Sequence, residues 1–261
     1  MSTPTAIKFK RLAVDIQPPV ASITLSNPPL NVIDIAMMEE LVGALAEIET
    51  QNEISVIVLR GAGKGFSAGV DVAAHAPEEV RAMLEKFHAV IRALVATRKV
   101  TIVAVAGHCL GGGAELAIVC DLVYTTDDAT WGFPEIQLGC FPPVAATALA
   151  SLIGQKRAAD LVLTGRTIAG EEASRIGLAN EAVPRNQLAT VVDERKNRLT
   201  ALSPAALAIT KKAVYAWDSM HFDKGLGRAE KIYFEELMNT EDVQEGIRAF
   251  LEKRKPQWKN R

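Results

Sequence analysis

Hydrophobic positions in the first hundred residues follow three patterns. Residues 11–25 alternate loosely between apolar and polar positions around Pro18-Pro19, which predicts a β-hairpin. Apolar side chains recur at helical spacing over residues 38–48, and again over residues 80–94. Short apolar runs at residues 55–59 and 100–106 are each followed closely by a glycine, which indicates buried strands.

The alternation of strand and helix continues to about residue 160. The pattern predicts a helix over 114–120, a strand over 122–125 and a helix over 144–153, an order typical of an α/β fold with parallel strands. Beyond residue 160 strand signals become sparse. Helical patterns then dominate, with a helix start at Ser203-Pro204 and a turn at Lys224-Gly225. We therefore predict an α/β core with the active site over residues 1–200 and a helical region over 201–261.

Composition narrows the classes of protein that this chain can represent. A length of 261 residues, 49% of them hydrophobic, is sufficient to bury a substantial core. The net charge of -2 favours neither nucleic acid nor an anionic membrane as a partner. The sequence shows neither a leader pattern nor an apolar run of about 18 residues, so we expect a soluble, cytoplasmic protein.

The cysteines give no sign of a metal site or a disulfide framework. Cys109, Cys120 and Cys140 form no C-x-x-C pair and have no histidine partner at metal-ligand spacing. An odd number of cysteines is typical of a reducing compartment. We therefore expect no bound metal.

Two glycine-rich stretches resemble functional motifs without the context that those motifs need. Gly65-Phe66-Ser67-Ala68-Gly69 has the G-x-S-x-G form of a serine-hydrolase elbow, but the preceding strand pattern ends at Leu59, too early for a strand–serine–helix turn. We interpret Ser67 as a loop residue. Residues 61–65 lack the G-K-[ST] ending of a phosphate-binding loop, so we interpret them as a turn.

The histidines and the basic C-terminal end provide weaker candidates. His88 lies in the second helical pattern and is predicted to be a surface or boundary residue. His75 follows the loop at 65–71 and is interpreted as structural, although it could approach a site there. The run Glu252-Lys253-Arg254-Lys255 is typical of a solvated helix end, and such an end can also receive a phosphate.

Two glutamates are the main candidates for chemistry. Glu115 follows Gly111-Gly112-Gly113 at a predicted helix start, where free N–H groups can face a ligand and the helix dipole favours a carboxylate. Glu135 follows Trp131-Gly132-Phe133-Pro134, an apolar setting that is expected to raise its pKa. Contrasting environments of this kind are typical of acid–base pairs. From the residues alone, a helix-start glutamate and a solvent-facing loop glutamate remain an equally open alternative.

Several separated motifs, in the same order, resemble the enoyl-CoA hydratase/isomerase (crotonase) family over residues 8–256. The motifs lie at residues 27–31, 66–71, 110–115, 120–121, 132–135, 163–165, 173–178 and 250–254. The resemblance implies a crotonase-like spiral of ββα units, with the helical C-terminal region serving oligomerisation into trimers or paired trimers. It also implies an acyl-CoA thioester as substrate. No separate cofactor is implied, since coenzyme A is part of that substrate.

The resemblance also assigns roles to particular residues. Glu115 is expected to act as the general base that takes a proton from water, and Glu135 to deliver a proton to the α-carbon. Which of the two holds the resting proton stays open. The oxyanion hole falls on the backbone N–H groups of Ala68 and Gly112. The residues expected to contact substrate or coenzyme A are Ala68, Gly69, Val70, Asp71, Gly112 and Lys253.

The sequence departs from the common hydratase pattern after the second glutamate. Residues 138–149 lack the expected Gln-Arg pair and contain Pro142-Pro143, which restrict the backbone beside the acid. Residues 27–35 also differ from the common form. These traits resemble the subgroup that hydrates cyclohexa-1,5-diene-1-carbonyl-CoA, and a short-chain enoyl-CoA hydratase is the alternative.

Two further functions remain open for a chain with these motifs. An enoyl-CoA isomerase would use one glutamate as a proton shuttle. A CoA-binding scaffold, such as an RNA-binding member of the family, would need a basic surface stripe, which the near-neutral charge does not favour.

Overall fold

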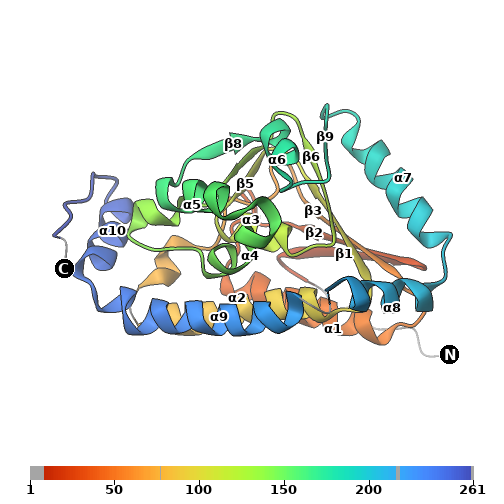
Figure 1. Cartoon of the computed structure of the whole chain (residues 1–261), viewed down its shortest axis with the longest axis horizontal. Coiled ribbons are helices and arrows are strands. Elements are labelled where there is room, and N and C mark those ends of the chain that lie inside the picture. The colour runs from red at the N-terminus through yellow and green to blue at the C-terminus, as the bar shows by residue number, and fades with distance from the viewer. Residues whose placement is uncertain (1–8, 77, 216–217, 260–261) are drawn as a thin grey trace.

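The larger of two β-sheets forms one wall of the molecule. The computed structural model describes residues 9–76, 78–215 and 218–259. Six strands lie in the order β1-β2-β3-β4-β6-β9, and only the β1–β2 pair is antiparallel (Figure 1). This confirms the predicted hairpin and the parallel core. The strands are β1 (Leu12–Gln17), β2 (Val20–Leu25), β3 (Val56–Gly61), β4 (Val100–Val105), β6 (Leu122–Thr126) and β9 (Glu181–Val183).

A smaller sheet carries the segments that lead into the candidate site. Its order is β5-β7-β8, with bounds His108–Leu110, Thr130–Gly132 and Thr167–Ala169. Each of β4 and β6 is followed by a strand of this small sheet and then by a helix. These ββα units confirm the predicted α/β class.

Helices pack on both faces of the large sheet. Helices α1 (Ile35–Thr50) and α2 (Val80–Ala96) contact each other and bury the apolar stripes predicted from their spacing. Asp34 begins α1 by accepting a hydrogen bond from the Met37 N–H at 2.8 Å. The next helices are α3 (Gly112–Ile118), α4 (Pro143–Ile153), α5 (Gln155–Thr164), α6 (Gly170–Ile176) and α7 (Leu188–Thr200).

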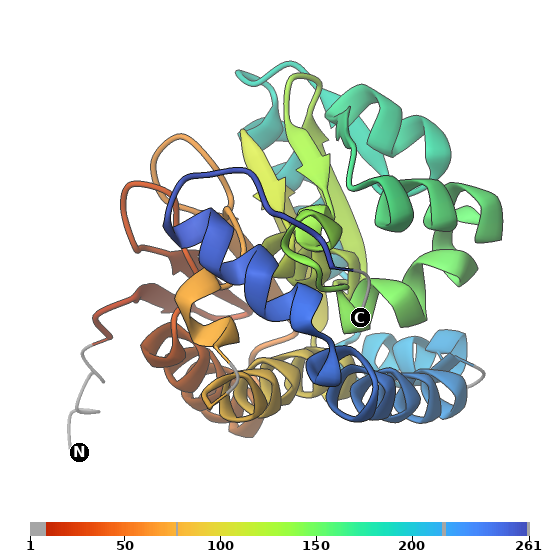
Figure 2. The ribbon, with the colours of Figure 1, turned by 90° about the vertical axis from the view of Figure 1, so that its left-hand side faces the viewer.

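The C-terminal region is helical, as predicted, and returns to the core. Helix α9 runs beside α2, on the side away from α1, and also contacts α4 (Figure 2), whereas α10 contacts the 3-10 helices η1 and η2. Its role in oligomerisation stays a prediction. Its elements are α8 (Pro204–Tyr215), α9 (Asp218–Glu235), η3 (Leu237–Asn239) and α10 (Glu241–Leu251), while η1 is Val72–His75 and η2 is Pro134–Leu138.

Two sequence-based expectations about local structure are wrong. Lys224-Gly225 is not a turn but lies inside α9, where a Cβ on Gly225 would come 2.7 Å from Thr147 Cγ2. The glycine therefore permits close packing of α9 on α4. His88 is fully buried rather than at the surface, because α9 covers that face of α2. Beyond residue 160, where strand signals are sparse, the described residues form only the short strands β8 and β9.

Candidate active site

A small cavity of about 80 Å³ brings most of the predicted site residues together. Apolar side chains from α2 and from the η2–α4 segment form its remaining walls, and Tyr233 reaches it from α9. Asp71 and Lys253 do not line this cavity. The predicted residues that line it are Ala68, Gly69, Val70, Gly112, Glu115 and Glu135.

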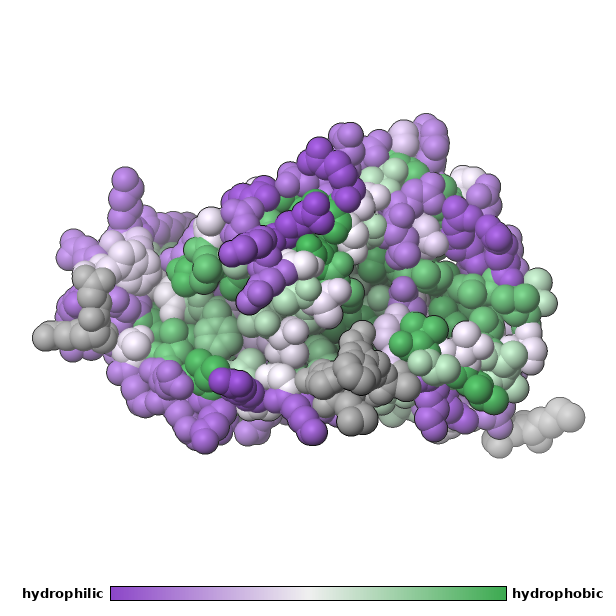
Figure 3. Space-filling model, viewed as in Figure 1, coloured by the Kyte–Doolittle hydropathy of each residue, from purple (hydrophilic) through white to green (hydrophobic). Residues whose placement is uncertain are grey.

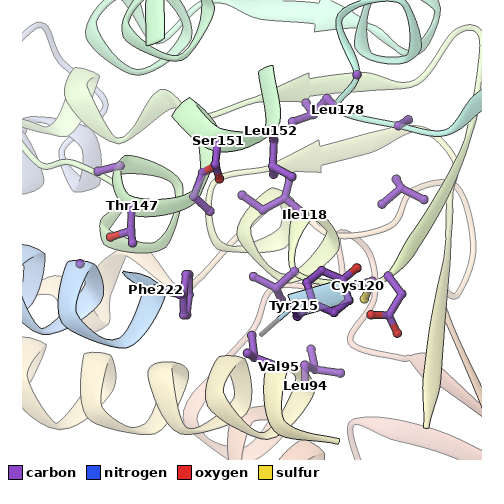
Figure 4. A pocket seen from close by; sticks show the side chains of 18 of the residues that line it. Leu94, Val95, Ile118, Cys120, Thr147, Ser151, Leu152, Leu178, Tyr215 and Phe222 are labelled. Atoms are coloured by element: carbon purple, nitrogen blue, oxygen red, sulfur yellow. The ribbon is translucent and has the colours of Figure 1, made fainter. Parts of the chain in front are cut away.

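A second, larger hollow lies between the core and helices α8 and α9. Its volume is about 1010 Å³, and none of the predicted site residues lines it. Figure 4 shows Ile118 and Leu152 from the core facing Tyr215 and Phe222 from the C-terminal helices. The candidate chemistry therefore belongs to the smaller cavity.

Glu115 is held by the first turn of α4. Its Oε1 accepts hydrogen bonds from the N–H groups of Val144 at 2.8 Å and Ala145 at 2.9 Å. Pro143 occupies the first helical position, where it has no N–H to offer, so the next two N–H groups face the carboxylate. The two prolines thus fix the helix start that orients this acid.

Burial controls the protonation of Glu115. Loss of solvent raises its pKa from 4.5 to about 7, although the two backbone hydrogen bonds oppose the shift. The expectation that the dipole of α3 would favour the ionised form is therefore wrong in its net effect. Desolvation outweighs the favourable contacts at this fully enclosed position.

Glu135 lies in the first turn of η2 and is even more strongly biased toward its protonated form. Burial raises the pKa of Glu135 well above its usual range, and the charge of nearby Glu115 raises it further. Its Oε2 atom is buried and has no hydrogen-bond partner among the residues that the structure describes. The predicted direction of its pKa shift is confirmed.

The triple glycine allows the second glutamate to lie directly against the backbone. Gly111 has a φ of 50°, and a Cβ there would come 2.6 Å from Oε1 of Glu135. The Gly111 N–H donates to the Gly132 carbonyl at 2.9 Å, which extends the pairing of β5 with β7. A Cβ on Gly112 would likewise come 2.6 Å from Cγ2 of Val70. A side chain at either glycine would therefore prevent the close contact with Glu135 or Val70.

The two predicted oxyanion-hole donors differ in their availability. Gly112 begins α3, and none of the described residues accepts a hydrogen bond from its N–H. The Ala68 N–H, by contrast, donates to the Leu30 carbonyl at 3.0 Å. One donor faces the cavity unpaired, and the other is already engaged.

Asn31 supports the loop that carries Ala68, a role that sequence reasoning missed. Its Nδ2 donates to the carbonyl oxygens of Ala62, Gly65 and Phe66 at 2.8, 3.0 and 3.2 Å. Ser67 Oγ donates to the Asn31 carbonyl at 2.7 Å and accepts from the Gly69 N–H at 3.1 Å. Ser67 is fully buried in this network, which agrees with its interpretation as a loop residue.

The remaining candidates lie around the cavity or away from it. His75 lines the cavity, and its Nδ1 lies 3.1 Å from the Asp71 carbonyl oxygen. The Asp71 side chain caps η1 by accepting a hydrogen bond from the Ala73 N–H at 3.1 Å. Lys253 is exposed just after α10. Its proposed contact with a coenzyme A phosphate stays a prediction.

The described part of the chain contains neither a metal-ligand cluster nor a helix suited to cross a membrane. No three histidine, cysteine, aspartate or glutamate side chains gather there as metal ligands would. None of its helices combines the length and the apolar character needed to cross a bilayer. Cys109, Cys120 and Cys140 are buried free thiols.

Comparison with known proteins identifies the family. The family model described as "Enoyl-CoA hydratase/isomerase" matches residues 15–261. A probable enoyl-CoA hydratase of Mycobacterium bovis is 36% identical over 256 residues, which cover 97% of this chain and 99% of the relative. A cyclohexa-1,5-dienecarbonyl-CoA hydratase of Thauera aromatica is 36% identical over 241 residues, 92% of each chain.

Solved structures show the same architecture. The crystal structure of an enoyl-CoA hydratase from Mycobacterium avium subsp. paratuberculosis has a TM-score of 0.88 and 25% identity, and the match covers 97% of this chain and 100% of that one. The family match, the curated relatives and the fold agree with one another. The chain therefore belongs to the enoyl-CoA hydratase/isomerase family of enzymes.

Proposed function

We propose that this enzyme adds water across the double bond of a 2-enoyl-CoA thioester, with Glu115 and Glu135 as its acid–base pair. The observation that carries the proposal is the presence of both carboxyl groups, with raised pKa values, in one enclosed cavity. A general base works best when its pKa lies near the working pH, and the pKa of Glu115 is about 7. The pKa of Glu135 is raised well above its usual range by burial and by Glu115, which favours the protonated form that can supply the second proton.

The reaction then divides between the two acids. Glu115 takes a proton from water as the water oxygen bonds to the β-carbon, and the π electrons move toward the thioester oxygen. Glu135 gives its proton to the α-carbon. Coenzyme A enters as part of the substrate, so no further cofactor is needed.

The developing charge on the thioester oxygen needs hydrogen-bond donors. The Gly112 N–H supplies one directly, since it is unpaired among the described residues. The Ala68 N–H supplies the second donor when its hydrogen bond to the Leu30 carbonyl is replaced by one to the substrate. Each such donor typically contributes about 2.7–4 kcal/mol to transition-state stabilisation.

The wall of the cavity favours a compact, apolar acyl group. Phe141, Pro142 and Pro143 line it from the segment that leads into α4, and Met83, Leu84 and Phe87 line it from α2. A flat cyclic dienoyl group would suit this rigid wall, as would a short linear enoyl chain. The Thauera aromatica relative is named as a hydratase of such a cyclic substrate.

Glutamine substitutions test the two-glutamate mechanism. We expect E115Q and E135Q each to lower kcat for hydration by about 10²- to 10⁴-fold. The measurement is water addition to crotonyl-CoA and cyclohexa-1,5-diene-1-carbonyl-CoA, followed by product mass. An isomerase would lose activity mainly with one substitution and a CoA-binding scaffold with neither. If neither substrate gains water in the wild-type enzyme, the proposal fails.

A further inference from the structure

Besides His75 and the two glutamates, the cavity contains a polar side chain that the two-glutamate mechanism does not use. Tyr233 comes from α9, is 1% exposed and lines the cavity beside Glu135. Its hydroxyl group has no hydrogen-bond partner at normal distance among the described residues, and neither does Oε2 of Glu135. The nearby Cys140 thiol donates to the Leu138 carbonyl instead, at 3.7 Å. An unpaired buried polar group costs about 1–3 kcal/mol, so both atoms call for a bound molecule that can pair with them.

The position of Tyr233 is fixed from two sides. Its ring packs against Phe141, with 5.2 Å between ring centroids. One turn earlier in α9, Oε1 of Glu230 lies 2.7 Å from Nδ1 of His88 and 2.9 Å from Nη2 of Arg92. His88 and Arg92 belong to α2, which also supplies cavity walls. The hydroxyl group is therefore held in place before any ligand binds.

Tyr233 is suited to binding an oxygen atom and unsuited to proton transfer. Burial raises the pKa of Tyr233, and the nearby Cys140, Glu135 and Glu115 raise it further, so the side chain stays a neutral phenol. A neutral phenol can donate one hydrogen bond and accept another. Water and an alcohol can also both donate and accept hydrogen bonds, whereas an alkyl chain can do neither.

We propose that the Tyr233 hydroxyl binds the oxygen that adds to the acyl group, first as water and afterwards as the 3-hydroxyl group of the product. This inference rests on the proposed hydration. Tyr233 neither gains nor loses a proton. The water proton still goes to Glu115, the new carbon–oxygen bond forms at the β-carbon, and Glu135 protonates the α-carbon. Tyr233 restricts where that oxygen can lie.

Binding measurements with Y233F test this contact separately from turnover. We use the E115Q background, in which the base is absent, and titrate butyryl-CoA and 3-hydroxybutyryl-CoA into E115Q and E115Q/Y233F. We expect Y233F to weaken binding of 3-hydroxybutyryl-CoA by about 10-fold, which corresponds to about 1.4 kcal/mol, and to leave butyryl-CoA binding unchanged. Equal weakening of both ligands, or no change in either, would overturn the inference.

Kinetics of the single variants complete the test. In otherwise wild-type enzyme, we expect Y233F to lower kcat for crotonyl-CoA hydration by about 10- to 100-fold with little change in KM. As a control, Y215F removes a phenol oxygen from a tyrosine that lines the larger hollow, and this variant should keep the wild-type kcat. An unchanged kcat in Y233F would also overturn the inference. If wild-type enzyme hydrates nothing while the ligand preference persists, the proposed function fails and the Tyr233–oxygen contact stands.

Discussion

At the scale of single residues, the two glutamates show a conflict between stability and chemistry. Both lie in a cavity with few compensating charges, Glu115 only 3% exposed and Glu135 half-buried, and burial raises the pKa of each. A group with a raised pKa in the folded state binds its proton more tightly there than in the unfolded chain. The folded protein is therefore destabilised as pH rises and removes that proton.

This conflict predicts a pH-dependent gain in stability for E115Q. The contribution of Glu115 to folding is full below pH 4.5, its ordinary pKa, and is lost as pH rises through about 7. Glutamine keeps an acceptor for the α4 N–H groups and never ionises. Relative to wild type, E115Q should gain roughly 3 kcal/mol in free energy of unfolding between pH 4.5 and pH 8.

Urea unfolding at these two pH values measures that gain. Glu47, on the exposed side of α1, provides a matched control, because E47Q removes the same charge outside the cavity. We expect E115Q to gain more stability than E47Q between the two pH values. Equal gains for the two variants would show that Glu115 does not carry a raised pKa.

At the scale of elements, helix α10 supports the segment that carries Glu135. Gly246 in α10 lies so close to η2 that an added Cβ would overlap the carbonyl group of Leu138. Gly139, at the end of η2, has a φ of 71° and faces the backbone of Asp242. At these two glycines the backbone of α10 contacts the backbone of η2 directly. No flexible side chain lies between them that could move aside for a larger residue.

We predict that G246A lowers both stability and activity. The new methyl group must push α10 away from η2, at a typical cost of about 1–3 kcal/mol. The same shift displaces Glu135, so kcat/KM should fall as well. Thermal unfolding and steady-state hydration measure the two effects.

Gly43 in the interior of α1 offers the matched substitution. An added Cβ there meets no atom within 4 Å, and alanine is the better helix former. G43A should therefore raise stability by about 0.5–1 kcal/mol and leave kcat/KM unchanged. Similar effects from G43A and G246A would contradict a specific role for the α10–η2 contact.

Sequence periodicity predicted the long elements and missed the short ones for a physical reason. Helices α1 and α2 and strands β3 and β4 bury continuous stripes or runs, which their own residues display. Strands β8 and β9 have three residues each, and they are strands because β7 and β6 pair with them. No local pattern encodes that pairing.

The same distinction applies to the candidate site. Local motifs indicated Glu115, Glu135 and Gly112, and the structure brings them to one cavity. Tyr233 could not be found this way, since it approaches the site only through the packing of α9 on α2 and α4. Asn31 was part of a motif, but its three carbonyl partners come from another loop.

At the scale of the whole molecule, apolar surface remains uncovered around the larger hollow. Figure 3 shows hydrophobic side chains around that opening and over α8. On α8, Ile209 is 70% exposed and Val214 is 65% exposed. Exposed apolar area of this kind is typical of a surface that another protein covers.

We predict that this surface serves the trimer or paired trimer implied by the family resemblance. Light scattering should then give three or six times the 28.1 kDa mass of one chain. The double substitution I209D/V214D should lower that mass, because charged side chains are costly to bury in an interface. A wild-type monomer at micromolar concentration would contradict the prediction.

The pairing of β5 with β7 also bears on how such an enzyme can diversify. Leu110 pairs with Gly132 in this parallel ladder, and each strand leads within a few residues to one of the two acids. The paired residues are 108–110 and 130–132, so neither position 115 nor position 135 belongs to the ladder. Either acid could therefore be exchanged with the ladder intact, and replacing a buried ionisable side chain by a neutral one would remove the cost of its desolvation. In this fold a single substitution can therefore change the reaction without a compensating stabilising substitution elsewhere in the chain.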